Sequence, residues 1–205
     1  MSSSVEVHTF QHWRKPASFI FAGGWLAAAL LTKPPVFATG WRMALEMLGF
    51  LLLIVAALGR VWAFAHIGGR KNLELCRGGP YGLTRNPLYF FSFLGVCGAG
   101  LALQSLVLFA AGCVFFLVYH AVVIRAEERR LAVLFGPAFE RYCAAVPRFW
   151  PRLARPDNGG EVTLSARLFA RMLLEVFWFL AAIVLIDIIE LAKIGHWWRV
   201  WTAGY

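Results

Sequence analysis

Two polar clusters in this chain carry the side chains that could do chemistry. The first, Gly78–Tyr89, holds Arg85 among glycines, prolines and tyrosines, and the second, Arg125–Pro151, opens near the carboxylates Glu127 and Glu128. Neither cluster has a Ser/His/Asp arrangement, a phosphate-binding Lys after a Gly-rich loop, or a metal-ligand triad. Carboxylates, arginines and tyrosines together suit a cationic, amino-acid-like cosubstrate, because they can bind ammonium, carboxylate and sulfonium groups.

The composition indicates that these clusters belong to a membrane protein. The chain has 205 residues, of which 60% are hydrophobic and 15% are charged, and this is too apolar for a soluble core of that size. Lys and Arg outnumber Asp and Glu by 20 to 11. The basic residues do not alternate with exposed aromatics, so nucleic acid is not an expected partner. The histidines and cysteines show no metal-ligand spacing, and we expect no metal.

Five apolar segments are expected to cross the bilayer, which makes the fold class an all-α integral membrane protein. In chain order they are Ala17–Leu31, Met43–Ala65, Leu88–Leu103, Leu106–Ile124 and Met172–Ala192. Only Gln104 and Ser105 separate the third and fourth segments, which predicts a tight antiparallel hairpin. The two polar clusters would then lie together at one membrane face.

Other features of these segments are less specific. An amphipathic helix on the cytosolic side is expected after Ile124 through about Ala145, interrupted at Gly136. Glycines on the hairpin permit either close helix packing or the approach of a ligand to the backbone. Arg60, near the end of the second segment, is interpreted as an anchor in the headgroup layer.

Charge asymmetry predicts the orientation of the chain. The basic residues expected outside the membrane on the side opposite the polar clusters are only Lys33, Arg42, Lys193 and Arg199. The positive-inside rule therefore places the amino terminus and both polar clusters in the cytosol. The membrane would be the bacterial inner membrane, or the endoplasmic reticulum of a eukaryote.

Several motifs follow one another in a specific order. They are Gly79-Pro80-Tyr81, Arg85-Asn86-Pro87-Leu88-Tyr89, the tight hairpin, Glu127-Glu128-Arg129-Arg130-Leu131, Phe135-Gly136-Pro137 with Tyr142, and Val146-Pro147. This order resembles the isoprenylcysteine carboxyl methyltransferase family and the related phosphatidylethanolamine N-methyltransferases, over roughly residues 45–151. The resemblance implies a methyltransferase that uses S-adenosylmethionine and acts on a lipid or lipid-linked acceptor, which we expect to enter from the bilayer between the third and fourth spans.

The resemblance also implies roles for individual residues. The residues expected to bind the cofactor are Tyr81, Arg85, Asn86, Pro87, Tyr89, Gly98, Gly100, Glu127 and Glu128. The residues expected to be catalytic are Arg85, Asn86, Tyr142 and Arg148. Arg148 would hold an anionic acceptor, whereas an amine acceptor would need Glu128 or Tyr142 to take its proton. Asn86 stands where family members often carry histidine, and because asparagine does not change charge near neutral pH, we expect it to position the cofactor.

The predicted organisation has three parts. Residues 1–42 form a tail and the first span, residues 43–156 form the methyltransferase core, and residues 157–205 form a linker and the last span. Two other functions stay open at this point. One is a membrane sterol or enone reductase, for which no nicotinamide phosphate-binding run is found, and the other is a membrane scaffold or transporter subunit.

Overall fold

The computed structural model describes residues 23–31, 39–68, 73–154 and 165–194, and every regular element in these ranges is helical. Residues 23–31 are helical. The elements that follow are α2 (Thr39–Ile67), the short 3-10 helix η1 (Gly79–Gly82), α3 (Pro87–Ala102), α4 (Leu106–Phe135), α5 (Pro137–Ala145) and α6 (Ala166–Ile194). The prediction of an all-α protein is therefore confirmed for the described residues.

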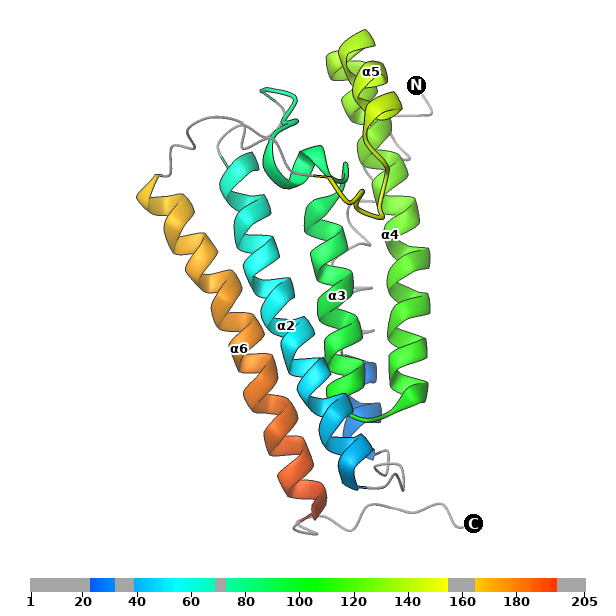
Figure 1. The fold of residues 1–205 in the computed structure, drawn as a ribbon, viewed down its shortest axis with the longest axis vertical. Coiled ribbons are helices and arrows are strands. Elements are labelled where there is room, and N and C mark those ends of the chain that lie inside the picture. The colour runs from blue at the N-terminus through cyan, green and yellow to red at the C-terminus, as the bar shows by residue number, and fades with distance from the viewer. Residues whose placement is uncertain (1–22, 32–38, 69–72, 155–164, 195–205) are drawn as a thin grey trace.

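The predicted hairpin is confirmed as α3 and α4, which run antiparallel with α3 packed between α2 and α4 (Figure 1). Pro87 begins α3, where its missing N–H costs no hydrogen bond. Gln104 adopts a positive φ of 55° in the turn. The Ser105 side chain then caps α4 by accepting a hydrogen bond from the Leu108 backbone N–H at 3.3 Å.

Three helical stretches are long and apolar enough to cross a membrane: Gly40–Ile67, Leu106–Phe135 and Ala166–Leu191. They contain the second, fourth and fifth predicted spans. α3 is apolar but has only 16 residues, about 24 Å of helix against a hydrocarbon core of about 30 Å. The first predicted span lies partly outside the described residues. Five spans are therefore not confirmed, and this number stays a prediction.

The predicted amphipathic helix is not a separate element in its first half. Residues 125–135 continue α4 without a break, and the chain turns only at Gly136, whose φ is 49°. α5 then folds back so that Phe139, Tyr142 and Val146 form a small apolar cluster against Leu131 and its neighbours. The interruption at Gly136 agrees with the sequence analysis, whereas the position of this segment at a membrane surface stays a prediction.

α6 packs along α2 and reaches the far end of the helix bundle (Figure 1). Near that end, Ile186 and Ile189 join a buried cluster with Leu53, Ala102 and Leu108. α6 begins six residues before the predicted span, because the Ser165 side chain accepts a hydrogen bond from the Leu168 N–H at 3.2 Å and caps the helix.

Candidate active site

The two polar clusters meet at one end of the α3–α4 hairpin, as the hairpin predicts (Figure 1). Two chain segments form the floor of the site: residues 82–86, which precede α3, and residues 146–152, which follow α5. The Arg85 N–H donates to the Pro147 carbonyl at 2.9 Å, and the Arg152 N–H donates to the Leu83 carbonyl at 3.1 Å. Pro147 and Pro151 lie in the second segment and Pro87 directly follows the first. These prolines disfavour a regular helix there, so the backbone groups pair across the two segments.

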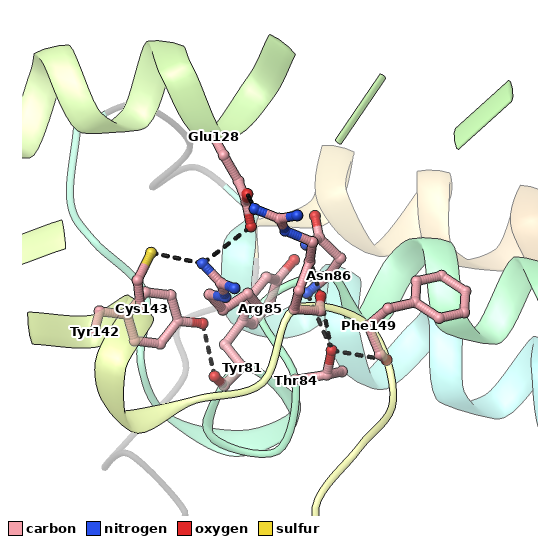
Figure 2. Close-up of polar contacts among 9 residues, drawn as sticks. Tyr81, Thr84, Arg85, Asn86, Glu128, Tyr142, Cys143 and Phe149 are labelled. Atoms are coloured by element: carbon pink, nitrogen blue, oxygen red, sulfur yellow. Dashed lines mark hydrogen bonds and ion pairs between the residues drawn. The ribbon is translucent and has the colours of Figure 1, made fainter. Parts of the chain in front are cut away.

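Side chains strengthen this pairing of the two segments. The Thr84 hydroxyl, which is buried, donates to the Phe149 carbonyl at 3.0 Å, and the Asn86 amide donates to the Arg148 carbonyl at 2.8 Å (Figure 2). The Arg152 guanidinium donates to the carbonyls of Gly82 and Ala145 at 2.9 and 3.1 Å. Asn86 thus has a positioning role within the protein itself, and Arg152 is used to close the turn.

Glu128 is the centre of an ion-pair triad. Its Oε1 lies 3.1 Å from Arg85 Nη1, and its Oε2 lies 2.8 Å from Arg148 Nη2 (Figure 2). The Glu128 and Arg85 side chains are only 11% and 13% exposed, whereas the Arg148 side chain is 52% exposed. The Arg85 Nη1 also contacts the Cys143 thiol. Glu128 and Arg85 therefore form the buried half of the triad, and Arg148 forms its solvent-facing rim.

Glu127 has a different partner, although it is adjacent in the chain. Its Oε2 accepts a hydrogen bond from the Tyr89 hydroxyl at 2.9 Å. The Tyr89 ring lies against His120 of α4, with 5.1 Å between the ring centroids. The two carboxylates consequently belong to separate contacts, one with a neutral hydroxyl from α3 and one with two arginines.

Tyr142 and Tyr81 form a buried pair. The Tyr142 hydroxyl donates to the Tyr81 backbone carbonyl at 2.7 Å (Figure 2). Burial raises the pKa of the Tyr142 phenol above its ordinary value, although Arg85 acts in the opposite direction. Burial also raises the pKa of the Tyr81 phenol, with a smaller contribution from Cys76. The Tyr142 hydroxyl therefore donates its proton to a hydrogen bond in this structure, and its catalytic role stays a prediction.

Three buried polar atoms of the site have no hydrogen-bond partner: Tyr81 Oη, Arg85 Nε and Glu128 Oε1. Glu128 Oε1 lies close enough to Arg85 for an ion pair, but the geometry of that contact is not that of a hydrogen bond. Buried polar groups rarely remain unpaired in proteins. One donor, one acceptor and one hydroxyl at the same place thus make a site that a polar ligand would complete.

Gly98 and Gly100 pack against neighbouring helices. A Cβ atom on Gly98 would lie 2.7 Å from the Gly49 carbonyl oxygen of α2, and one on Gly100 would lie 2.7 Å from the Phe109 Cα of α4. Protein backbone lies beside both glycines, which favours the helix-packing interpretation, and their contact with a ligand stays a prediction. Pro87 is buried at the start of α3 and shapes the backbone there. The remaining predicted residues lie together around Arg85 and Glu128.

The sequence analysis missed two residues that help to build the site, Thr84 and Phe149. Thr84 fixes the floor through its hydroxyl, as described above. Phe149 packs between Phe90 and Phe93 of α3, with centroid distances of 6.0 and 5.8 Å, and anchors the 146–152 segment to α3. The prolines at 147 and 151 were the available signal, because they predict an extended segment whose backbone groups need partners.

Within the part of the chain that the structure describes, no group of three or more His, Cys, Asp or Glu side chains could hold a metal ion. The expected absence of a metal from the whole protein stays a prediction.

Comparisons with known proteins bear on the same region. The profile of the phospholipid methyltransferase family matches residues 40–138. The chain is 33% identical over 198 residues to the nickel-cobalt-cadmium resistance protein NccN of Alcaligenes xylosoxydans xylosoxydans, covering 96% of this chain and 90% of NccN. It is 32% identical over 194 residues to the cobalt-zinc-cadmium resistance protein CzcN of Cupriavidus metallidurans, covering 90% of this chain and 82% of CzcN. No solved structure matches the chain.

Proposed function

Because the chain belongs to the phospholipid methyltransferase family, we propose that it transfers a methyl group from S-adenosylmethionine to a lipid or lipid-linked acceptor in the membrane. The observation that carries this proposal is the set of unpaired buried atoms around Arg85 and Glu128. The reductase alternative has no observation in its favour.

The residues of the site fit the polar groups of S-adenosylmethionine. The cofactor carries a carboxylate and an ammonium on one carbon atom, and a sulfonium. Arg85 Nε, which makes no hydrogen bond, can donate to a carboxylate. Glu128 Oε1 is ion-paired with Arg85 but accepts no hydrogen bond, so it can accept one from an ammonium. Tyr81 offers a hydroxyl that can do either. Glu127 and Tyr89, joined by a hydrogen bond, add a negative charge and an aromatic ring near the same place, and both favour a cation.

When it is bound, S-adenosylmethionine supplies the electrophilic methyl group. The chain then has to orient the reactants and exclude water, and orientation of this kind contributes roughly 7–11 kcal/mol in favourable cases. The segments 82–86 and 146–152 suit this task, because their backbone hydrogen bonds fix Arg85 and Asn86 in position. Because these residues are already fixed before the cofactor binds, less conformational entropy is lost on binding.

The same groups favour an acceptor that is already anionic, such as a carboxylate or a phosphate. An amine would need a base, but Asn86 does not change charge and the raised pKa of Tyr142 keeps its phenol protonated. Both oxygens of Glu128 already face guanidinium groups. Arg148 has half of its side chain exposed beside the site, and this exposed part is suited to hold an anionic group of the acceptor.

Entry of the acceptor from the bilayer follows from the short α3 helix. The site lies at the start of α3, whose 16 residues extend about 24 Å and are shorter than a hydrocarbon core of about 30 Å. The reacting centre is therefore expected near the level of the lipid headgroups. Moving an acyl or prenyl chain into water would cost roughly 0.8 kcal/mol per methylene, so lateral entry between α3 and α4 is favoured for long-chain acceptors.

A transfer assay tests this proposal. Purified full-length protein is incubated with methyl-labelled S-adenosylmethionine and a total lipid extract, and the label is then located. We expect label in a lipid fraction with wild-type protein and much less with Glu127→Gln. Absence of lipid labelling, together with absence of S-adenosylmethionine binding by calorimetry, would contradict the proposal.

The names of the relatives favour a second candidate, a role in resistance to divalent metals. Methyl transfer could serve that role by changing the charge of lipid headgroups, or resistance could be independent of it. An experiment can distinguish resistance through methyl transfer from resistance without it. A deletion strain is complemented with wild-type protein or Glu127→Gln, and growth is measured in nickel, cobalt, zinc or cadmium. Equal protection by both proteins would favour a metal-resistance function without methyl transfer.

A further inference from the structure

Arg60 of α2 makes a polar network inside the helix bundle, next to the first turn of α3. Its Nε donates to Glu175 Oε2 of α6 at 2.7 Å. Its Nη1 donates to the Ser92 hydroxyl and to the Leu88 carbonyl, the latter at 3.4 Å. The Ser92 hydroxyl in turn donates to the Leu88 carbonyl at 2.8 Å. One guanidinium therefore joins three helices.

Arg60 thus has a specific partner within the bundle, in addition to the headgroup anchor expected from the sequence. The Arg60 and Glu175 side chains are only 19% and 28% exposed, and both lie within stretches long and apolar enough to cross a membrane. A lone charge inside the hydrocarbon core is unfavourable, so the two charges hold each other in place. The remaining donors of Arg60 are directed at α3, where Ser92 and the Leu88 carbonyl accept them.

Arg60 contacts α3 directly beside the residues of the candidate site. Leu88 is adjacent to Tyr89, which bonds to Glu127, and is two residues after Asn86, which bonds to the Arg148 carbonyl. The hydrogen bond from the Tyr89 hydroxyl to Glu127 requires the first turn of α3 to keep its orientation about the helix axis and its position along that axis. Glu175, which lies outside the region matched by the family profile, pairs with the same guanidinium that contacts this turn.

We infer that Glu175 is a positioning residue of the site, acting through Arg60 on the first turn of α3. This inference rests on the proposed function for its effect on S-adenosylmethionine. α6 is then more than a membrane anchor, because it supplies the counter-charge that fixes the first turn of α3 beside the site. Without the Glu175 charge, the Arg60 side chain would no longer be held in place, and its hydrogen bonds to Ser92 and the Leu88 carbonyl would be weakened.

The same two helices offer a matched control at their other end. Arg42 of α2 pairs with Glu190 of α6 at 3.3 Å, and Arg42 and Glu190 both bond to Gln104 in the α3–α4 turn. Both ion pairs tie α2 to α6. Only the Arg60–Glu175 pair lies beside the candidate site, so a purely structural role for α6 predicts similar consequences from breaking either pair.

The experiment compares Glu175→Gln with Glu190→Gln in the full-length protein in detergent. S-adenosylmethionine affinity is measured by calorimetry, stability by thermal unfolding, and local opening by hydrogen exchange of the backbone amides of residues 90–93. We expect Glu175→Gln to weaken affinity about tenfold, the scale of one charge-assisted hydrogen bond, and to speed exchange at these amides. Glu175→Asp should restore part of the affinity and part of the exchange protection. Glu190→Gln should leave affinity and exchange close to those of wild-type protein.

Equal affinity losses in the two variants, or unchanged affinity and exchange in Glu175→Gln, would overturn the inference. If Glu175→Gln does not fold, the double variant Arg60→Met with Glu175→Met removes both charges, and the same affinity loss and faster exchange are expected. If wild-type protein binds no S-adenosylmethionine, the proposed function fails. The exchange comparison then still decides whether Glu175 fixes α3.

Discussion

Replacing Glu127 and Glu128 one at a time by glutamine tests how the two carboxylates divide between binding and folding. Glu127 accepts a hydrogen bond from the neutral Tyr89 hydroxyl, and glutamine keeps an oxygen that can accept it. Glu127→Gln should therefore cost less stability than Glu128→Gln. It removes the negative charge offered to the cofactor, which should weaken S-adenosylmethionine binding by about 1.5–3 kcal/mol, or roughly tenfold to 150-fold.

Glu128→Gln should lower both affinity and stability. The pair with Arg148 is half exposed and contributes only about 0–1 kcal/mol. The pair with Arg85 is nearly buried, and removing one partner of a buried pair costs about 3–5 kcal/mol. Because glutamine still offers one acceptor oxygen, we expect a loss near the lower limit, about 3 kcal/mol, with Arg85 left without a nearby counter-charge.

The assay combines calorimetric titration of S-adenosylmethionine with denaturant unfolding of each purified variant. The expected pattern is lower affinity in both variants and a larger loss of stability in Glu128→Gln than in Glu127→Gln. Equal stability of the two variants would refute the argument from burial. Unchanged affinity in both would remove the carboxylate pair from the cofactor site.

Three further predictions follow from individual contacts. Arg148→Ala should lower kcat/KM far more for anionic than for neutral lipid acceptors, because its exposed guanidinium borders the site; equal losses for anionic and neutral acceptors would contradict this role. Burial raises the pKa of the Tyr142 phenol, so its contribution to stability is complete below about pH 10 and declines as the pH rises further. Tyr142→Phe should reduce that alkaline decline in thermal unfolding, and a decline that wild-type protein already shows between about pH 7 and 9 would argue against this cause. Gly98→Ala should cost about 1–3 kcal/mol of stability, since its Cβ would lie 2.7 Å from the Gly49 carbonyl oxygen. Gly112→Ala is the control, because there the nearest atom is a Val96 methyl group at 3.0 Å that can move, and equal unfolding midpoints would count against the packing argument.

Much of the candidate site could be predicted from the sequence because the hairpin leaves few alternatives. A connection as short as Gln104-Ser105 forces the two apolar segments to lie side by side and antiparallel. Arg85 and Glu128, which are 43 positions apart in the chain, must then meet at one end, and the structure places them 3.1 Å apart. The lengths of the helices were harder to predict, because polar residues after Ile124 suggested a break that continuous backbone hydrogen bonding in α4 does not make.

By itself, the sequence determined the helical class, the tight hairpin and the membership of the phospholipid methyltransferase family. These follow from local composition, from the order of motifs and from the length of one turn. Only the tertiary structure decided which partner each polar side chain takes. Tyr142 bonds to a carbonyl, Gly98 packs against α2, and Arg60 turns toward Glu175, which is 115 positions away in the chain. The physical reason is that each choice depends on how the helices are rotated and spaced against one another, and no local pattern encodes those quantities.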